Sequence, residues 1–435
     1  MGLLYLYIYT IILLVILIKS IIDKKNSMYC FMWGLYALSG VFCIINKTFQ
    51  DEIIGNGYSH NQWFDLSDSS LLAFFLIILC CYISFRPLQY YNADRFVNGF
   101  EYDQVNKMLL LILSVCYFVF FVTYLATSFS IVVQSFSITD YGSMRDTLYG
   151  NANHESTVVI SASPIGNICF KICWALRYLI VYVCFILIRN RRKLIGIIVL
   201  ICNFFLVYIY SNLNAARGGL LIFLFCAFLF AFPILKKLSK RIKRILLIGA
   251  IVIAIVAINF VLGVTVSRTA NNQSGNNLVL QNICFYLGHA PIIFSKLFGS
   301  LNDFAYGQFT IGRLLNHFFG FSYDIAAIKQ QLGYPSVLNY LFSTYLFPIY
   351  ADFGSIGCVL FFSLSSFLMK KVIKEPKIRL STVFLFSYYV NFFITGNFVI
   401  SSLEFASTIT TVFIFLVFRL LENIIIQKSR INKRL

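Results

Sequence analysis

The sequence SNLNAARGG, residues 211–219, separates two strongly apolar runs, Leu194–Tyr210 and Leu220–Leu235. Together the two runs are too long for one bilayer crossing, which takes about 20 residues. The simplest interpretation is a helical hairpin whose tight turn holds Arg217 at the membrane edge. The glycines at positions 218 and 219 let the backbone come close to another group. An arginine in this position needs an anionic partner.

The composition places the rest of the chain in the membrane as well. Of the 435 residues, 59% are hydrophobic and 12% are charged, and the mean hydropathy is +0.81, far outside the range of soluble domains. The 47 Phe and 27 Tyr residues are enough for lipid-facing surface and for interfacial belts. Because the apolar runs are continuous rather than alternating, we expect an all-α polytopic membrane protein.

Eleven apolar runs alternate with basic clusters and with polar loops. Because Lys and Arg are enriched in cytoplasmic loops, this order predicts a periplasmic N-terminus and a cytoplasmic C-terminus. Most of the net charge of +18 lies in these clusters, so it does not predict a nucleic-acid partner. The expected crossings are Gly2–Ile22, Tyr29–Ile45, Ser70–Phe85, Met108–Ser128, Ile168–Ile188, Leu194–Tyr210, Leu220–Leu235, Ile245–Val266, Tyr345–Met369, Leu380–Ile400 and Leu403–Ile426.

The pattern changes between residues 267 and 343, where no segment is apolar for 18 residues. We expect one integral-membrane domain over residues 1–435 with a large external loop at this position. Two pieces, Leu278–Phe298 and Phe309–Phe319, are amphipathic enough for helices that lie in the interface or cover the mouth of the bundle. Loops of this length in a compact protein are usually functional or disordered, and the aromatic content argues against disorder.

Few basic residues lie on the predicted external side. They are Lys47, Arg145, Arg217, Arg268, Lys296, Arg313 and Lys329, with Lys171 near a boundary. Arginine offers a planar fork of donors that suits phosphate, so several converging forks suit a pyrophosphate. The alternative for each is a lipid headgroup or a loop carboxylate. For Arg217, followed by Gly218 and Gly219, the pattern favours a ligand.

Two residues are candidates for a catalytic base. His317 lies four residues after Arg313, which places both on one face if this segment is helical. Asp352 lies near the predicted outer end of a crossing, where it either acts as a base or orients one, or else pairs with an arginine or caps a broken helix. His289 is a second histidine candidate. The histidines do not pair at metal-ligand spacing, and HExxH and CxxC motifs are absent, so we predict no metal site.

Two segments resemble a known family of membrane enzymes. AARGG at residues 215–219 resembles the Arg-Gly element of bacterial oligosaccharide repeat-unit polymerases, the Wzy-type O-antigen polymerases. FSTY at residues 342–345, with YADFG at 350–354 and then Gly357, is similar to their Tyr-Thr…Asp-Phe-Gly-x-x-Gly segment. The chain has Ser343-Thr344 in place of the plainer Asn-x-Tyr-Thr, which leaves the role of Asn339 open.

The resemblance implies a glycosyltransferase of GT-C-like architecture in the bacterial inner membrane. The donor would be a growing glycan on undecaprenyl pyrophosphate, and the acceptor would be one lipid-linked repeat unit whose hydroxyl attacks the anomeric carbon. Membrane lipid and a chain-length regulator protein are the further partners it implies, and it calls for no cofactor.

The same resemblance assigns roles to the candidate residues. An arginine cluster would stabilise the charge on the leaving pyrophosphate, and a base would take the hydroxyl proton. The implied pyrophosphate site is Arg217, Arg268 and Arg313 with Gly218 and Gly219. The implied base is His317 or Asp352, and Tyr286, Tyr323 and Tyr345 are candidates to stack on sugar rings.

Three other classes of protein stay open. An O-antigen ligase shares the lipid donor and the large external loop, and it differs in the acceptor. A lipid-linked oligosaccharide flippase would show internal halves and charges along a mid-membrane path. A purely structural membrane protein is the third class. The chain has no Walker motif, no GxGxxG on a strand–helix turn and no GxSxG, so nucleotide-driven transport has no support.

Overall fold

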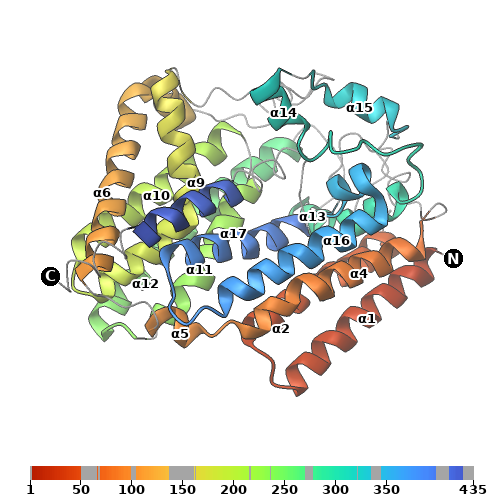
Figure 1. Ribbon diagram of the computed structural model, residues 1–435, viewed down its shortest axis with the longest axis horizontal. Helices are drawn as coiled ribbons and strands as arrows, with labels where there is room; N and C mark the ends of the chain where they lie inside the picture. Colours follow the sequence, from red (N-terminus) through yellow and green to blue (C-terminus); the bar gives the residue numbers. More distant parts are fainter. Residues whose placement is uncertain are drawn as a thin grey trace. The chain divides into compact units, whose positions relative to one another are not determined.

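The apolar runs form helices because a lipid environment leaves the backbone N–H and C=O groups no partners except one another. Figure 1 shows these helices in a computed structural model. The structure describes residues 2–49, 66, 69–98, 104–136, 161, 163–214, 217–235, 237–269, 278–320, 322–334, 344–397 and 411–424. Over these residues, eight helices are long and apolar enough to cross a membrane. The chain is therefore a multi-pass α-helical membrane protein.

The eight helices coincide with eight of the predicted crossings. They are α1 (Gly2–Ile22), α2 (Ser27–Thr48), α4 (Leu71–Phe85) with the 3-10 helix η2 (Arg86–Tyr90), α6 (Gln104–Thr127), α9 (Pro164–Arg189), α10 (Lys193–Leu213), α12 (Lys240–Thr269) and α16 (Phe347–Ile373). The other three predicted crossings correspond to shorter helices, which are α11 (Arg217–Leu235), α17 (Leu380–Gly396) and residues 411–424. Eleven crossings therefore stay a prediction.

The remaining helices are short or lie in the predicted external loop. They are α5 (Ala93–Asn98), α7 (Phe129–Phe136), α13 (Leu278–Leu297), α14 (Gly312–Phe319) and α15 (Ile325–Gln331).

The contacts of the chain divide it into two compact units. Unit 1 comprises Met1–Asn92, Asn272–Glu375 and Tyr389–Thr410. Unit 2 comprises Ala93–Asn271, Pro376–Tyr388 and Thr411–Leu435. Each unit has its own buried interior, and the single domain over residues 1–435 stays a prediction.

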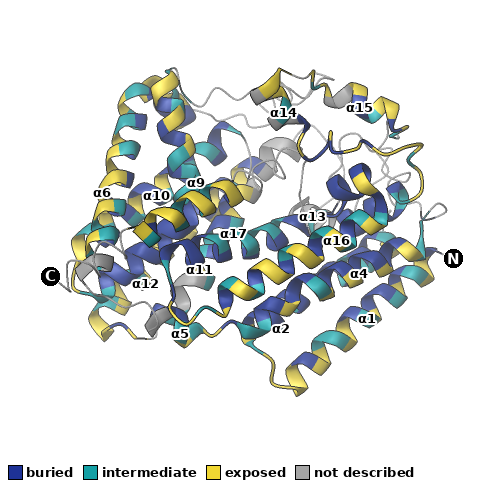
Figure 2. Cartoon of the chain, in the orientation of Figure 1, coloured by how far each residue is buried: buried dark blue, intermediate teal, exposed yellow. Residues whose placement is uncertain are grey.

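Exposed residues run along α1 and α16 of unit 1 (Figure 2), and many of them are large and apolar. On α1, Leu4, Ile11 and Ile18 are more than half exposed, and their spacing of seven residues, about two turns, keeps them on one helix face. On α16, Ile356 and Leu360 are exposed in the same way. Apolar surface of this extent would be unfavourable in water, so it suits contact with lipid.

The interior of unit 1 is built around α2, whose small and polar residues let its neighbours come close. A Cβ on Gly40 would lie 2.9 Å from Thr10 Oγ1 of α1. On α13, a Cβ on Gly288 would lie 2.5 Å from the carbonyl carbon of Phe42. Such close backbone approach at small residues is how helices associate in membranes, where lipid competes with apolar contacts.

Side chains of α2 also satisfy backbone carbonyls of α13. The bonds run from Ser39 Oγ to Leu287 O (2.7 Å), from Cys43 Sγ to Gly288 O (3.0 Å) and from Asn46 Nδ2 to Cys284 O (2.7 Å). Pro291 lies inside α13 and has no N–H to donate to Leu287, four residues earlier. The Ser39 hydroxyl donates to that carbonyl instead, so α2 compensates for the proline.

This packing places α13 deeper than expected. A helix over Leu278–Phe298 is confirmed, but residues 288–295 are all buried in unit 1. The amphipathic pattern predicts a helix that lies in the interface or covers the mouth of the bundle. The apolar face instead packs along α2, so part of the predicted loop belongs to the interior.

Ser39→Ala is expected to lower the free energy of unfolding by about 1–3 kcal/mol, because the Leu287 carbonyl, inside the bundle, would be left without a hydrogen-bond donor. Ser295→Ala is the matched control, because the buried Ser295 hydroxyl only donates to the carbonyl of Ile292 in its own helix. A thiol-reactive dye during heating in detergent would report unfolding, because ten of the twelve cysteines are buried. Equal melting temperatures for the two variants would contradict the compensation.

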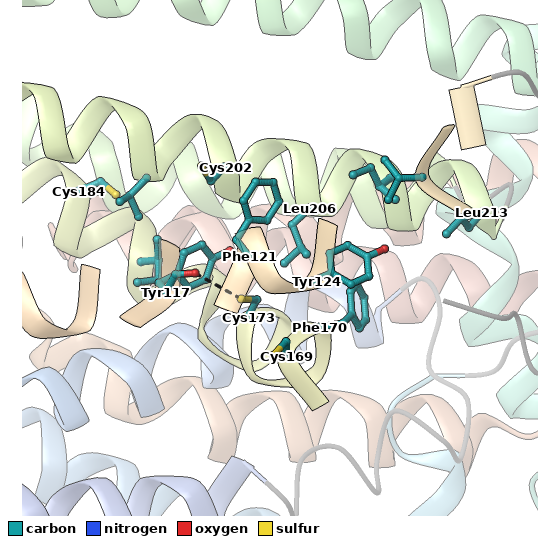
Figure 3. Close-up of a cluster of buried hydrophobic side chains, with 14 residues drawn as sticks. Tyr117, Phe121, Tyr124, Cys169, Phe170, Cys173, Cys184, Cys202, Leu206 and Leu213 are labelled. Atoms are coloured by element: carbon teal, nitrogen blue, oxygen red, sulfur yellow. Dashed lines mark hydrogen bonds between the residues drawn. The ribbon is translucent and has the colours of Figure 1, made fainter. Parts of the chain in front are cut away.

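Unit 2 has its interior between α6, α9 and α10 (Figure 3). Tyr117, Tyr124 and Phe170 are among the buried rings that fill it. The Tyr117 hydroxyl donates to Asn203 Oδ1 (2.7 Å), and Asn203 Nδ2 donates to the backbone carbonyl of Arg177 (2.8 Å). An asparagine bonded on both sides of its amide ties the three helices together. The second of these bonds places Asn203 of α10 beside Arg177 of α9.

Candidate functional site

The predicted hairpin turn joins α10 to α11. The last turn of α10 is closed by Asn214, whose backbone N–H and side-chain amide both donate to the Tyr210 carbonyl (3.1 Å and 2.7 Å). Arg217, Gly218 and Gly219 form the first turn of α11. The N–H groups in a first helical turn have no acceptor within the helix, and the helix dipole favours an anion there. The two helices are in contact, and Arg217 lies at the N-terminus of α11, whereas the turn between them stays a prediction.

A buried hydroxyl lies beside this turn. Ser211 is fully buried, and its Oγ has no hydrogen-bond partner within the described ranges. A Cβ on Gly219 would lie 3.7 Å from this oxygen, so the hydroxyl faces the first turn of α11, and Gly219 itself is exposed. A buried polar group without a partner costs about 1–3 kcal/mol, and such groups are rare in folded proteins. Ser211 is therefore placed to donate to a ligand at the helix N-terminus.

Arg268 is the second predicted pyrophosphate residue. It lies one residue before the end of α12, which runs back along α11. Arg217 and Arg268 therefore lie at the same end of this helix pair in unit 2. The backbones of Arg217, Gly218 and Arg268 are described, whereas the side chains of the two arginines lie outside the described part of the chain.

The helix predicted to carry Arg313 and His317 is present as α14 in unit 1. Their spacing of four residues therefore places both on one helix face. Their side chains are also outside the described part. Because Arg217 and Arg268 belong to unit 2, the convergence of the three arginines stays a prediction.

Asp352 ties the loop before α14 to the start of α16. Its side chain is completely buried, with Oδ1 accepting the Phe309 N–H (2.9 Å) and Oδ2 accepting the Thr310 N–H (2.8 Å). The backbone N–H groups of Ala305 and Tyr306 also donate to α16, to the carbonyls of residues 351 and 352 (2.8 Å and 3.2 Å). Four hydrogen bonds thus hold residues 305–310 against α16.

A break in α16 leaves backbone carbonyls free to accept hydrogen bonds from this loop. Gly354 has φ 67° and ψ −166°, a conformation that favours glycine and interrupts the helix. The carbonyls of Ala351 and Asp352 accept N–H groups from the loop at this break. The Phe304 ring covers the break, since a Cβ on Gly354 would lie 3.0 Å from Phe304 Cζ. This geometry favours the alternative in which Asp352 stabilises a broken helix over the one in which it is a base.

The three predicted glycan-stacking tyrosines occupy different environments. Tyr345 is completely buried, its ring is 5.1 Å from those of Phe362 and Phe393, and its hydroxyl lies 3.2 Å from Cys81 Sγ. Its stacking on a sugar does not fit this position, because the ring is enclosed by unit 1. Tyr286 and Tyr323 are half-buried, so their glycan contact stays a prediction.

His289, the second histidine candidate, is completely buried on α13. It packs edge-on against Tyr286, with ring centres 6.0 Å apart. This position does not fit a base that acts on a substrate from outside. The described residues also contain no group of three or more His, Cys, Asp and Glu side chains that could hold a metal ion.

Arg177 is a charged residue of the interior that the sequence pattern did not single out. It lies near the middle of α9 and is only 9% exposed. It falls within the apolar run Ile168–Ile188, where a lone arginine barely changes the hydropathy. The available signal was its distance of 12 residues from Arg189, which is too far along the helix for its side chain to reach the cytoplasmic cluster.

Comparison with known proteins adds no relative. The chain matches no protein-family model, no curated protein and no solved structure. A functional proposal therefore depends on the geometry and on the resemblance of the two short segments.

Proposed function

We propose that this protein is a membrane glycosyltransferase that polymerises lipid-linked oligosaccharide repeat units. The growing glycan would pass from undecaprenyl pyrophosphate to a hydroxyl of a new lipid-linked repeat unit, on the periplasmic face of a bacterial inner membrane. The observation that carries the proposal is the α10–α11 turn. There Arg217 and two glycines open a helix N-terminus beside the buried Ser211 hydroxyl. These groups are all suited to bind a phosphate.

In the proposed reaction, the bond between the anomeric carbon of the donor and its pyrophosphate breaks as the acceptor hydroxyl attacks that carbon. Arg217, Arg268 and Arg313 would stabilise the negative charge on the leaving pyrophosphate. His317 would take the hydroxyl proton.

Asp352 would act as a positioning residue in this reaction. Its carboxylate holds Phe309 and Thr310, immediately before the helix that carries Arg313 and His317. Breaking this contact would free the start of α14.

The principal alternative is an O-antigen ligase, which would use the same donor with lipid A as acceptor. A flippase is the second alternative, because Arg177 places one charge inside a membrane-spanning helix, as a substrate path would. The GT-C-like architecture and a chain-length regulator as partner belong to the proposal for the polymerase.

Arg217→Ala in a deletion strain should collapse the glycan ladder on a gel to single-repeat species at matched expression. The reason is that the leaving pyrophosphate loses its main counter-charge. Arg241→Ala on the same helix pair, at the predicted cytoplasmic end of α12, is the control and should preserve the ladder. A ladder that persists when Arg217, Arg268 and Arg313 are all replaced would contradict the proposed site. Loss of even the single-repeat glycan from lipid A would indicate the ligase.

A further inference from the structure

We propose that Arg177 is a second, membrane-embedded anion-binding residue that takes one phosphate group of the lipid diphosphate below the α10–α11 turn. The inference rests on the proposed function and extends its site into the helices of unit 2. In this inference, the Arg177 side chain binds a ligand and does not serve only to stabilise the fold.

The first argument is that, among the described residues, the partners of Arg177 are all neutral. Its Nη1 donates to the Trp174 carbonyl (2.6 Å), and its Nη2 donates to the Tyr178 hydroxyl (3.4 Å). Its guanidinium carbon lies 4.0 Å and 4.4 Å from the centres of these two rings and 5.8 Å from that of Tyr388. No Asp or Glu of the described chain pairs with it. A charge within a membrane-spanning helix normally has a partner of opposite sign or serves a ligand.

The second argument is position. The ring of Trp174 lies 4.2 Å from the ring of Tyr210 on α10, centre to centre. Tyr210 precedes the end of α10 at Leu213 by three residues, which is about 5 Å along the helix. On α11, Phe223 lies 6.0 Å from Tyr178, centre to centre. The guanidinium therefore lies where α9, α10 and α11 meet, within about two helical turns of Arg217.

The third argument is direction. Side chains on an α-helix lean toward its N-terminus, and Arg177 follows this rule by bonding to Trp174, three residues earlier. The N-terminus of α9 and the turn that carries Arg217 are at the same predicted outer end. The Arg177 side chain thus reaches toward the turn and away from the basic cluster that begins at Arg189.

The fourth argument is the Ser211 hydroxyl, an independent sign of a ligand site in this region. It is buried, has no partner in the described chain and faces the first turn of α11. A diphosphate has two phosphate groups at different heights. One would meet Arg217, the N–H groups of α11 and Ser211, and the other would meet the fork of Arg177. The ring of Trp174, which is half-buried, would border the first isoprene units.

The test is binding of farnesyl diphosphate to the purified full-length chain in phosphatidylcholine nanodiscs. Arg177→Gln should weaken binding by about ten- to a hundredfold, because hydrogen bonds to charged groups are strong. Arg177→Lys should weaken it less, because the charge remains while the planar fork is lost. Arg189→Gln is the matched control, since it removes the same charge from the other end of α9, and it should bind as the wild type does.

Ser211→Ala keeps the test decisive if the Arg177 variants do not fold. The variant removes a buried hydroxyl that has no hydrogen-bond partner in the described chain, so its melting temperature should be equal to or higher than that of the wild type. Its affinity for farnesyl diphosphate should fall about fivefold or more. Wild-type affinity in Arg177→Gln, or in Ser211→Ala if the Arg177 variants do not fold, would overturn the inference.

Two further arms separate the sources of phosphate. Inorganic pyrophosphate should compete with farnesyl diphosphate, and replacement of phosphatidylcholine by phosphatidylglycerol should not abolish binding. Competition by phosphatidylglycerol alone would assign Arg177 to bulk headgroups and overturn the inference. Failure of the proposed function has a different signature: the wild type would bind farnesyl diphosphate with its Arg177 dependence intact, while cells that express it make no polymer.

Discussion

Asp352→Ala is expected to lower the free energy of unfolding by about 2–5 kcal/mol and to abolish polymer formation. The carboxylate is fully buried, and its two oxygens accept the N–H groups of Phe309 and Thr310. Removing it would leave two donors without an acceptor, each at a cost of about 1–3 kcal/mol. Residues 309 and 310, just before α14, would then lose their bonds to α16, and the backbone bonds of Ala305 and Tyr306 would remain. Dye-monitored melting in detergent and the glycan ladder would measure the two effects.

Two further variants separate the roles of Asp352. Asp352→Asn keeps one acceptor oxygen and places an amide N–H donor opposite a backbone N–H donor. We therefore expect a smaller loss of stability than in Asp352→Ala, and a loss of polymer formation in proportion to the loss of stability. Asp303→Ala in the same loop is the control, because Asp303 is exposed where it accepts from the Phe304 N–H and the Tyr306 hydroxyl. An Asp352→Asn protein as stable as the wild type but inactive would instead identify Asp352 as the base.

Gly288→Ala is expected to prevent correct folding of unit 1, with a cost of more than about 3 kcal/mol. A Cβ there would lie 2.5 Å from both the carbonyl carbon and the oxygen of Phe42. Those atoms belong to the backbone of α2 and cannot rotate away. To make room, α13 would have to move off α2, which would break the hydrogen bonds from Ser39, Cys43 and Asn46.

The control for this substitution is Gly249→Ala on α12, where an added Cβ would meet nothing within 4 Å. Size-exclusion chromatography of fluorescently tagged protein should show a single sharp peak for Gly249→Ala and aggregation or loss for Gly288→Ala. A sharp peak with an unchanged melting temperature for Gly288→Ala would show that α2 and α13 are farther apart than this structure has them.

Position within the chain explains why some site residues could be predicted and others could not. The turn at Arg217 was visible because a polar stretch with two glycines interrupts two long apolar runs. Arg177 was missed because a single charge within an apolar run leaves the local pattern nearly unchanged. Its significance depends on Trp174, Tyr178 and Tyr210, and the pairing of α9 with α10 is needed to bring Tyr210 beside it.

The sequence by itself determined the class of this protein and where its main helices lie, since the backbone of a long apolar segment in lipid can satisfy its polar groups only as a helix. It also placed the polar stretch around Arg217 between two helices, which are α10 and α11. The role of Asp352, the depth of α13 and the enclosure of Tyr345 were decided only by the tertiary structure. Each depends on contacts between residues distant in the chain, such as the 42 positions between Thr310 and Asp352, which no local pattern records.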